Sequence, residues 1–161
     1  MDDIASLSSE SDDPRFPHID DIVSLCDDLN GLRLPDLDDN DLLDALLVRV
    51  NAALCPLETL VPMLHVLENH PDHDFGAPGS LVHTIEAVKI SDDEYFDLII
   101  ESVGRRPTEY NLWLMSRVMN SFDDDEAVAR GVAVFHQVAL DATDDVIKSA
   151  ARDFIAHFSS P

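Results

Sequence analysis

Apolar residues recur at spacings of three and four along most of the chain, which is the pattern of an α-helix with one buried face. The first such stripe consists of Ile22, Leu25, Cys26 and Leu29. It stops at Asn30-Gly31, a common end of a helix, because glycine takes the conformation needed there without strain. The alternation of apolar and polar residues that indicates a half-buried strand is nearly missing. The pattern therefore predicts an all-α protein.

Eight amphipathic segments follow one another, and several begin or end at clear local signals. Ser91 with Glu94 matches a capping box, and Pro107-Thr108 breaks and restarts the chain. The predicted helices span about residues 20–30, 40–54, 56–70, 80–88, 91–103, 108–120, 125–139 and 144–158.

The helices pair at a nearly constant interval, since the pairs begin near residues 20, 56, 92 and 124. Spacings of about 36, 36 and 32 residues are typical of stacked helical hairpins. We therefore expect a HEAT-like α-solenoid of four antiparallel hairpins. The repeats share length without clear residue-level similarity, so an irregular helical bundle remains the alternative.

The chain divides into a tail and one domain. Residues 1–17 are rich in Ser, Asp and Pro and predict a flexible acidic tail, and residues 18–161 predict a single helical-repeat domain. No stretch approaches the ~18 consecutive apolar residues of a membrane span. The start Met1-Asp2-Asp3 lacks the basic, then apolar order of a secretory signal, so we expect a cytoplasmic protein. Cys26 and Cys55 are too few for a disulfide scaffold and get no functional role.

Charge limits the possible partners. The chain holds 33 acidic and 10 basic residues, a net charge of −23, which repels nucleic acid and anionic membranes. Residues 1–45 alone hold 14 acids and 2 bases. Two explanations stay open: the acidity attracts a basic protein partner, or it reflects a GC-rich or salt-adapted host.

Histidine and aspartate gather in the stretch HVLENHPDHDFGAPGSLVH. Its potential metal ligands are His65, His70, Asp72, His73, Asp74 and His83. A His-Asp pair invites comparison with metal-dependent phosphohydrolases, but this pair lies in a loop rich in Pro and Gly, and no Glu-x-x-His pairs recur. Local hydrogen bonds in the loop are the favoured interpretation, with Gly76 and Gly79 in backbone conformations that other residues resist. With no nucleophile elbow or phosphate loop in the sequence, we expect no enzyme activity, no cofactor and no metal.

Two stretches, ENHPDHDFGAPGSLVHTIE at 68–86 and ESVGRRPTEYNLWLMSRVMNS at 101–121, resemble one known family. It consists of small, acidic, helical immunity proteins of bacterial polymorphic toxin systems, such as contact-dependent inhibition and Rhs toxins. The matching residues of the first stretch are His70, Pro71, Asp74, Phe75, Gly76, Pro78, Gly79, Leu81, Val82 and His83. Those of the second are Arg106, Pro107, Thr108, Leu112, Trp113 and Arg117. The resemblance covers about a third of the chain. Ser80, His73 and the long acidic N-terminus depart from the family pattern.

The resemblance implies an immunity protein that binds a cognate toxin domain and occludes its active site. Charge suggests the means, because acidic side chains can take the place of phosphates in a basic cleft. Second helices of stacked hairpins often line a partner-binding face. The predicted partner-binding residues, on those helices and in the His-Asp loop, are Asp41, Asp44, Asp72, Asp74, Glu86, Asn111 and Asn120. Two alternatives remain: a metal-dependent hydrolase of HD-like type using His70, His73 and Asp74, and a general helical-repeat adaptor. Tyr110 and Trp113 are predicted to belong mainly to the core.

Overall fold

The computed structural model describes residues 19–33, 41–54, 56–88 and 90–159. Within them the chain forms eight α-helices and one 3₁₀ turn and no strand, which confirms the all-α prediction. The helices are α1 Ile19–Gly31, α3 Asp41–Ala52, α4 Leu60–Asn69, α5 Ser80–Ala87, α6 Asp92–Arg105, α7 Glu109–Met119, α8 Asp125–Asp141 and α9 Asp145–Phe158, and the 3₁₀ turn is Leu57–Thr59. The predicted tail, 1–17, and Cys55 lie outside the described residues. None of the helices described has the length and apolarity needed to cross a bilayer.

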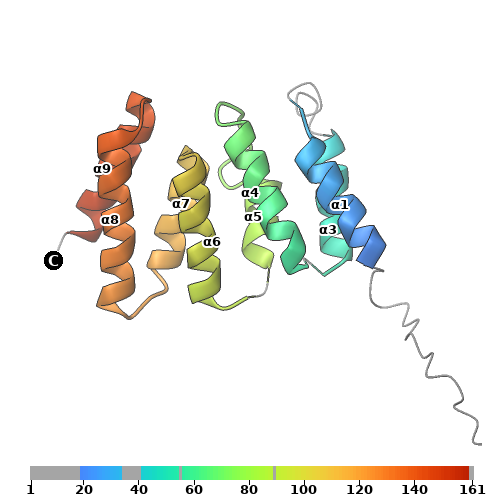
Figure 1. The fold of residues 1–161 in the computed structure, drawn as a ribbon, viewed down its shortest axis with the longest axis horizontal. Helices are drawn as coiled ribbons and strands as arrows, with labels where there is room; N and C mark the ends of the chain where they lie inside the picture. Colours follow the sequence, from blue (N-terminus) through green and yellow to red (C-terminus); the bar gives the residue numbers. More distant parts are fainter. Residues whose placement is uncertain (1–18, 34–40, 55, 89, 160–161) are drawn as a thin grey trace, which may run out of the picture.

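The helices form a row of hairpins two layers deep (Figure 1). Helices α1, α4, α6 and α8 make one layer, and their partners α3, α5, α7 and α9 make the other. Each hairpin packs on its neighbour, through α1 with α4, α3 with α5, α4 with α6 and α7 with α8. This is the stacked arrangement predicted from the repeat spacing.

One continuous apolar core runs through the stack. In the first predicted stripe Leu25 and Leu29 are buried and Ile22 and Cys26 are partly buried. Further along the chain the core includes Phe96, Ile99 and Phe135. Full burial of such a side chain contributes roughly 1.5–3 kcal/mol. Because each helix has a single apolar face, at least two layers of helices are needed to bury these faces against each other.

Polar pairs join neighbouring helices at the surface of this core. The most buried of them links Glu68 on α4 with Arg105 on α6, whose Nε and Nη2 donate to the carboxylate at 3.0 and 2.8 Å. Further pairs between described helices include Asp28–Arg49, Asp44–Ser80, Glu86–Arg117 and Asp97–Arg130. Exposed pairs of this kind contribute at most about 1 kcal/mol each to the free energy of unfolding, so their main effect is on the relative orientation of neighbouring helices.

The loop Pro71–Gly79 joins α4 to α5 and contains two glycines that are required for different reasons. Gly76 has φ +84°, as expected for a left-handed turn. Gly79 has φ −86°, so the predicted unusual conformation is wrong there. Glycine is needed at this position because a Cβ atom would lie 1.4 Å from the Phe75 carbonyl oxygen.

Replacing Gly79 with alanine should therefore destabilise the protein by about 2 kcal/mol or more, since the loop backbone must move to admit the methyl group. The control is Gly104→Ala in α6, where nothing lies within 4 Å of an added Cβ. Alanine favours a helix over glycine by up to about 1 kcal/mol, so this variant should be more stable than wild type. Urea unfolding measures both, and equal midpoints for Gly79→Ala and wild type would contradict the steric account.

Candidate functional site

A cleft of about 1020 Å³ opens where the loops of three successive hairpins meet. Its walls come from the α4–α5 loop, the turn between α6 and α7 and the turn between α8 and α9. Stacked antiparallel hairpins bring their internal turns to one edge of the row, which is the upper edge in Figure 1. The cleft is thus a product of the repeat architecture.

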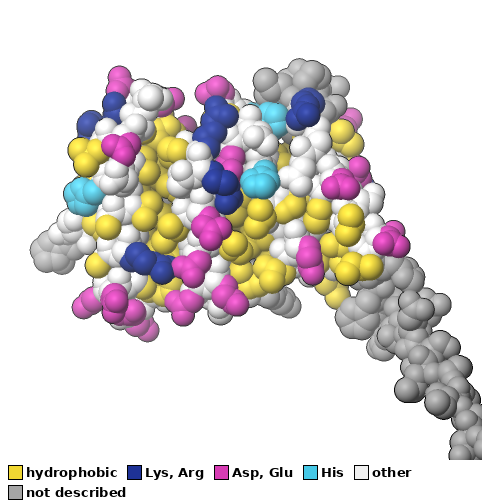
Figure 2. Space-filling view, viewed as in Figure 1, with side chains coloured by type: hydrophobic (Ala, Val, Ile, Leu, Met, Phe, Trp, Pro, Cys, Tyr) yellow, Lys and Arg dark blue, Asp and Glu magenta, His cyan; other side chains and the backbone are white. Residues whose placement is uncertain are grey.

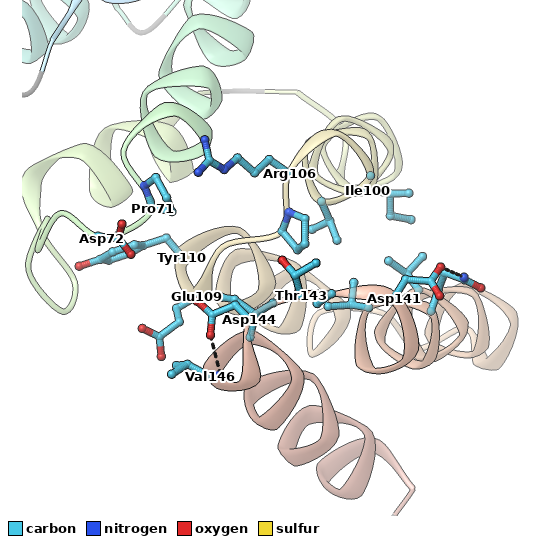
Figure 3. A pocket seen from close by; sticks show the side chains of 18 of the residues that line it. Pro71, Asp72, Ile100, Arg106, Glu109, Tyr110, Asp141, Thr143, Asp144 and Val146 are labelled. Atoms are coloured by element: carbon cyan, nitrogen blue, oxygen red, sulfur yellow. Dashed lines mark hydrogen bonds between the residues drawn. The ribbon is translucent and has the colours of Figure 1, made fainter.

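The cleft has an apolar floor and an acidic rim. The floor consists of Ile100, Val103, Val134, Val138 and Ile147. The described residues that line it include five with carboxylates, Asp72, Asp74, Glu109, Asp141 and Asp144, against a single guanidinium, that of Arg106 (Figure 3). A surface of this kind favours cations that also carry apolar groups.

The five carboxylates differ in how far the fold already uses them. Asp144 caps α9 by accepting from the Val146 N–H at 2.7 Å, and Asp141 accepts from the Gln137 amide. Asp74 accepts from the Gly76 N–H at 2.8 Å. Asp72 and Glu109 form no hydrogen bond or ion pair with any residue that the structure describes. These two retain their full capacity to bind a partner.

Tyr110 holds the α4–α5 loop against α7. Its hydroxyl accepts from the Phe75 N–H at 2.9 Å and donates to the Asp74 carboxylate at 3.2 Å. Its ring meets the edge of Phe75, with centroids 5.5 Å apart, and Phe75 in turn packs on His73. Burial raises the pKa of Tyr110, so the hydroxyl stays protonated at neutral pH and can donate. Tyr110 is only partly buried, so it serves both core and cleft.

The turn between α6 and α7 is held from inside by Asn111. Its Oδ1 accepts from the Thr108 N–H at 2.8 Å, while its Nδ2 donates to Ser102 Oγ at 3.1 Å and to the Arg106 carbonyl at 2.9 Å. The Thr108 hydroxyl completes a capping box by accepting from the Asn111 N–H. Asn111 is fully buried, so its predicted place on a partner-binding surface is wrong. The spacing Thr-x-x-Asn after Pro107 is the signal that sequence reasoning missed.

Four of the predicted partner-binding residues, Asp41, Asp44, Glu86 and Asn120, are not among those that line the cleft. Asp41 and Asp44 are exposed in the first turn of α3, and Asp44 accepts from the Ser80 hydroxyl at 2.8 Å. Glu86 on α5 pairs with Arg117, which also covers the ring of Trp113. Asn120 is exposed at the end of α7. The structure therefore brings Asp72 and Asp74 together, and it adds Glu109, Asp141 and Asp144, which sequence reasoning missed.

The three residues of the hydrolase alternative have separate roles in the loop. His70 is buried, and its Nδ1 has no hydrogen-bond partner among the described residues. His73 packs on Phe75, and Asp74 bonds to Tyr110 and Gly76. Across the described ranges, no group of three or more His, Cys, Asp or Glu side chains converges as a metal ligand set. His70, His73 and Asp74 thus do not form the arrangement that this alternative requires.

Comparison of the chain with protein-family models, curated proteins and solved structures finds no match. The cleft itself is therefore the starting point for assigning a function.

Tyr110→Phe should destabilise the protein by about 1–2 kcal/mol, because the buried Phe75 N–H loses its acceptor. Tyr95→Phe is the matched control, since the buried Tyr95 hydroxyl has no hydrogen-bond partner among the described residues. That variant should match or exceed wild-type stability. Thermal unfolding compares the two, and hydrogen exchange at the Phe75 amide should be faster only in Tyr110→Phe. Equal losses in both variants would show that the Tyr110 hydroxyl does not hold the loop.

Stability should also fall as the solution becomes acidic, because of His70. Burial lowers the pKa of His70 below its ordinary 6.5, and the nearby His73, Arg33 and Arg106 lower it further. The unfolded chain then binds the proton more readily, so the contribution of His70 is present above pH 6.5 and is lost as pH falls toward the folded pKa. As the pH falls below 6.5, wild type should lose stability relative to His70→Gln, by at most about 1.4 kcal/mol per pH unit. Parallel stability curves for the two proteins would contradict this.

Proposed function

We propose that this chain is an immunity protein that binds the toxic domain of a bacterial polymorphic toxin in the cytoplasm and neutralises it. The observation that carries the proposal is the cleft at the loop edge, whose described lining residues include five carboxylates, a single arginine and several apolar side chains. Such a site suits a basic protein segment. The resemblance of residues 68–86 and 101–121 to immunity proteins supplies the class of partner.

The proposed mechanism is occlusion without turnover. Toxins that act on nucleic acid need basic active-site clefts, and an acidic protein can occupy such a cleft in place of phosphates. The net charge of −23 adds long-range attraction that raises the rate of encounter. Acidic residues also gather at the opposite edge of the row, below α6 and α8 in Figure 2, from the exposed segments 92–94 and 123–126. They extend the field beyond the cleft.

A direct test first identifies the product of the neighbouring gene and, if it contains a toxin-like domain, pairs this chain with that domain. Expression of the toxic domain alone should stop growth, and co-expression of this chain should restore it. The two proteins should then purify as a stoichiometric complex. Binding without restored growth would favour the adaptor alternative, and no binding at micromolar concentrations would contradict the proposal.

The association rate with the toxic domain should depend strongly on salt. Between about 50 and 500 mM NaCl the Debye length shrinks from about 14 to 4 Å, so the rate constant should fall by roughly tenfold or more. Dissociation should change much less, because contacts at short range are screened less. Stopped-flow fluorescence over a salt series measures both. A rate constant that is insensitive to salt would show that the acidity plays no part in binding and would favour host adaptation.

A further inference from the structure

We propose that the cleft binds an arginine side chain presented by a short segment of the partner protein, with Asp72 and Glu109 as its carboxylate ligands. This inference rests on the proposed function and deepens it, because it names the chemistry of the contact. Asp72 belongs to the α4–α5 loop and Glu109 to the first turn of α7, so the two ligands come from neighbouring hairpins.

Asp72 and Glu109 are singled out by what the other rim carboxylates already do. Asp74, Asp141 and Asp144 accept hydrogen bonds that hold the loop or the helix ends. If a cation bound to those three carboxylates, it would weaken the hydrogen bonds that they accept within the fold. Asp72 and Glu109 form no hydrogen bond or ion pair with described residues, so a cation gains their acceptors at no such cost.

The resident cation of the cleft does not neutralise these carboxylates. Arg106 forms no salt bridge with any residue in the described part of the chain. In Figure 3 its guanidinium points away from Glu109 and Asp144, toward the side where Pro71 and Asp72 lie. The acidic rim therefore keeps its charge toward solvent and is complementary to a cation from outside.

The floor of the cleft favours arginine over lysine. Val103, Val138 and Ile147 are apolar lining residues that the methylene groups of a long side chain can contact, and the aromatic residue Tyr110 also lines the cleft. A guanidinium is planar, donates in a fork to carboxylates and is weakly hydrated, whereas an ammonium is compact and strongly hydrated. Arginine also stacks on aromatic rings more often than lysine. A volume of about 1020 Å³ exceeds one side chain, so neighbouring residues of the segment also fit.

Both walls are held before the partner arrives. Tyr110 bonds to the loop that carries Asp72, and the buried Asn111 fixes the turn that precedes Glu109. A site that is already ordered loses less conformational entropy on binding, which favours affinity.

The test uses two capped seven-residue peptides that alternate glycine with arginine or with lysine. Fluorescence anisotropy at 150 mM NaCl should give a Kd at least about fivefold lower for the arginine peptide, given the fork geometry and weak hydration of the guanidinium. Asp72→Asn with Glu109→Gln should raise that Kd by about tenfold, because each exposed ion pair contributes up to about 1 kcal/mol.

The matched control is Asp93→Asn with Asp123→Asn, which removes the same charge from the opposite edge of the row. Both are exposed and form no hydrogen bond or ion pair with described residues. The control should change the Kd by less than about twofold, since at this ionic strength the Debye length of about 8 Å screens distant charges. Equal weakening by both pairs would overturn the cleft as the site, and equal binding of both peptides would overturn the choice of arginine.

Failure of this inference can be told apart from failure of the proposed function. If the Asp72/Glu109 variant restores growth and binds the toxic domain with wild-type affinity, the cleft assignment is overturned while the immunity function stands. If wild type binds the arginine peptide in the cleft but does not restore growth, the immunity function is overturned and the peptide result stands.

Discussion

The amide of Asn111 is the contact on which the proposed site depends. It satisfies the Thr108 N–H, the Ser102 hydroxyl and the Arg106 carbonyl at once, in a place that water does not reach. A buried polar group left without a partner costs about 1–3 kcal/mol, so these bonds allow the turn between α6 and α7 little freedom. Glu109 and Tyr110 directly precede Asn111 in the chain. The direction in which they project is thus set by a residue that no partner can touch.

The second wall of the cleft is positioned across hairpins. Glu68 at the end of α4 is 6% exposed and is held by Arg105 at the end of α6, just before the α4–α5 loop and the α6–α7 turn begin. Desolvating a carboxylate offsets much of the attraction in such a pair, so its net contribution to stability is small. Its geometric effect is larger, because the bidentate contact fixes the ends of two helices relative to each other. Together with Tyr110, it sets the separation of the two loops.

The positions of the helices could be predicted from the sequence because each helix buries one face, so that apolar residues recur along the chain with a period of about 3.6 residues. The cleft could not be predicted, because it depends on which turns lie at the same edge of the row of hairpins. Asp72 and Asp74 were singled out by the loop that contains them, whereas Glu109 and Asp144 were not singled out by any sequence signal. Asp72, Glu109 and Asp144 lie at the turns of successive hairpins, and that relation is visible only once the repeats are stacked. The prediction for Asn111 was wrong because the sequence does not distinguish a polar residue that forms a buried helix cap from one that makes an exposed contact with a partner.

The net acidity alone does not distinguish a surface that binds a basic partner from a surface that is acidic because of adaptation to the host. The position of each carboxylate does. The first turns of helices, where the helix dipole favours negative charge, hold Asp92, Asp93, Glu109, Asp125 and Glu126, and Asp124 and Asp144 act as caps. Those residues have a local structural role whatever the partner. Asp72 has none, since it caps no helix and forms no hydrogen bond or ion pair with a described residue. A charge at the rim of the cleft that has no local structural role has its natural complement in a cation from another molecule.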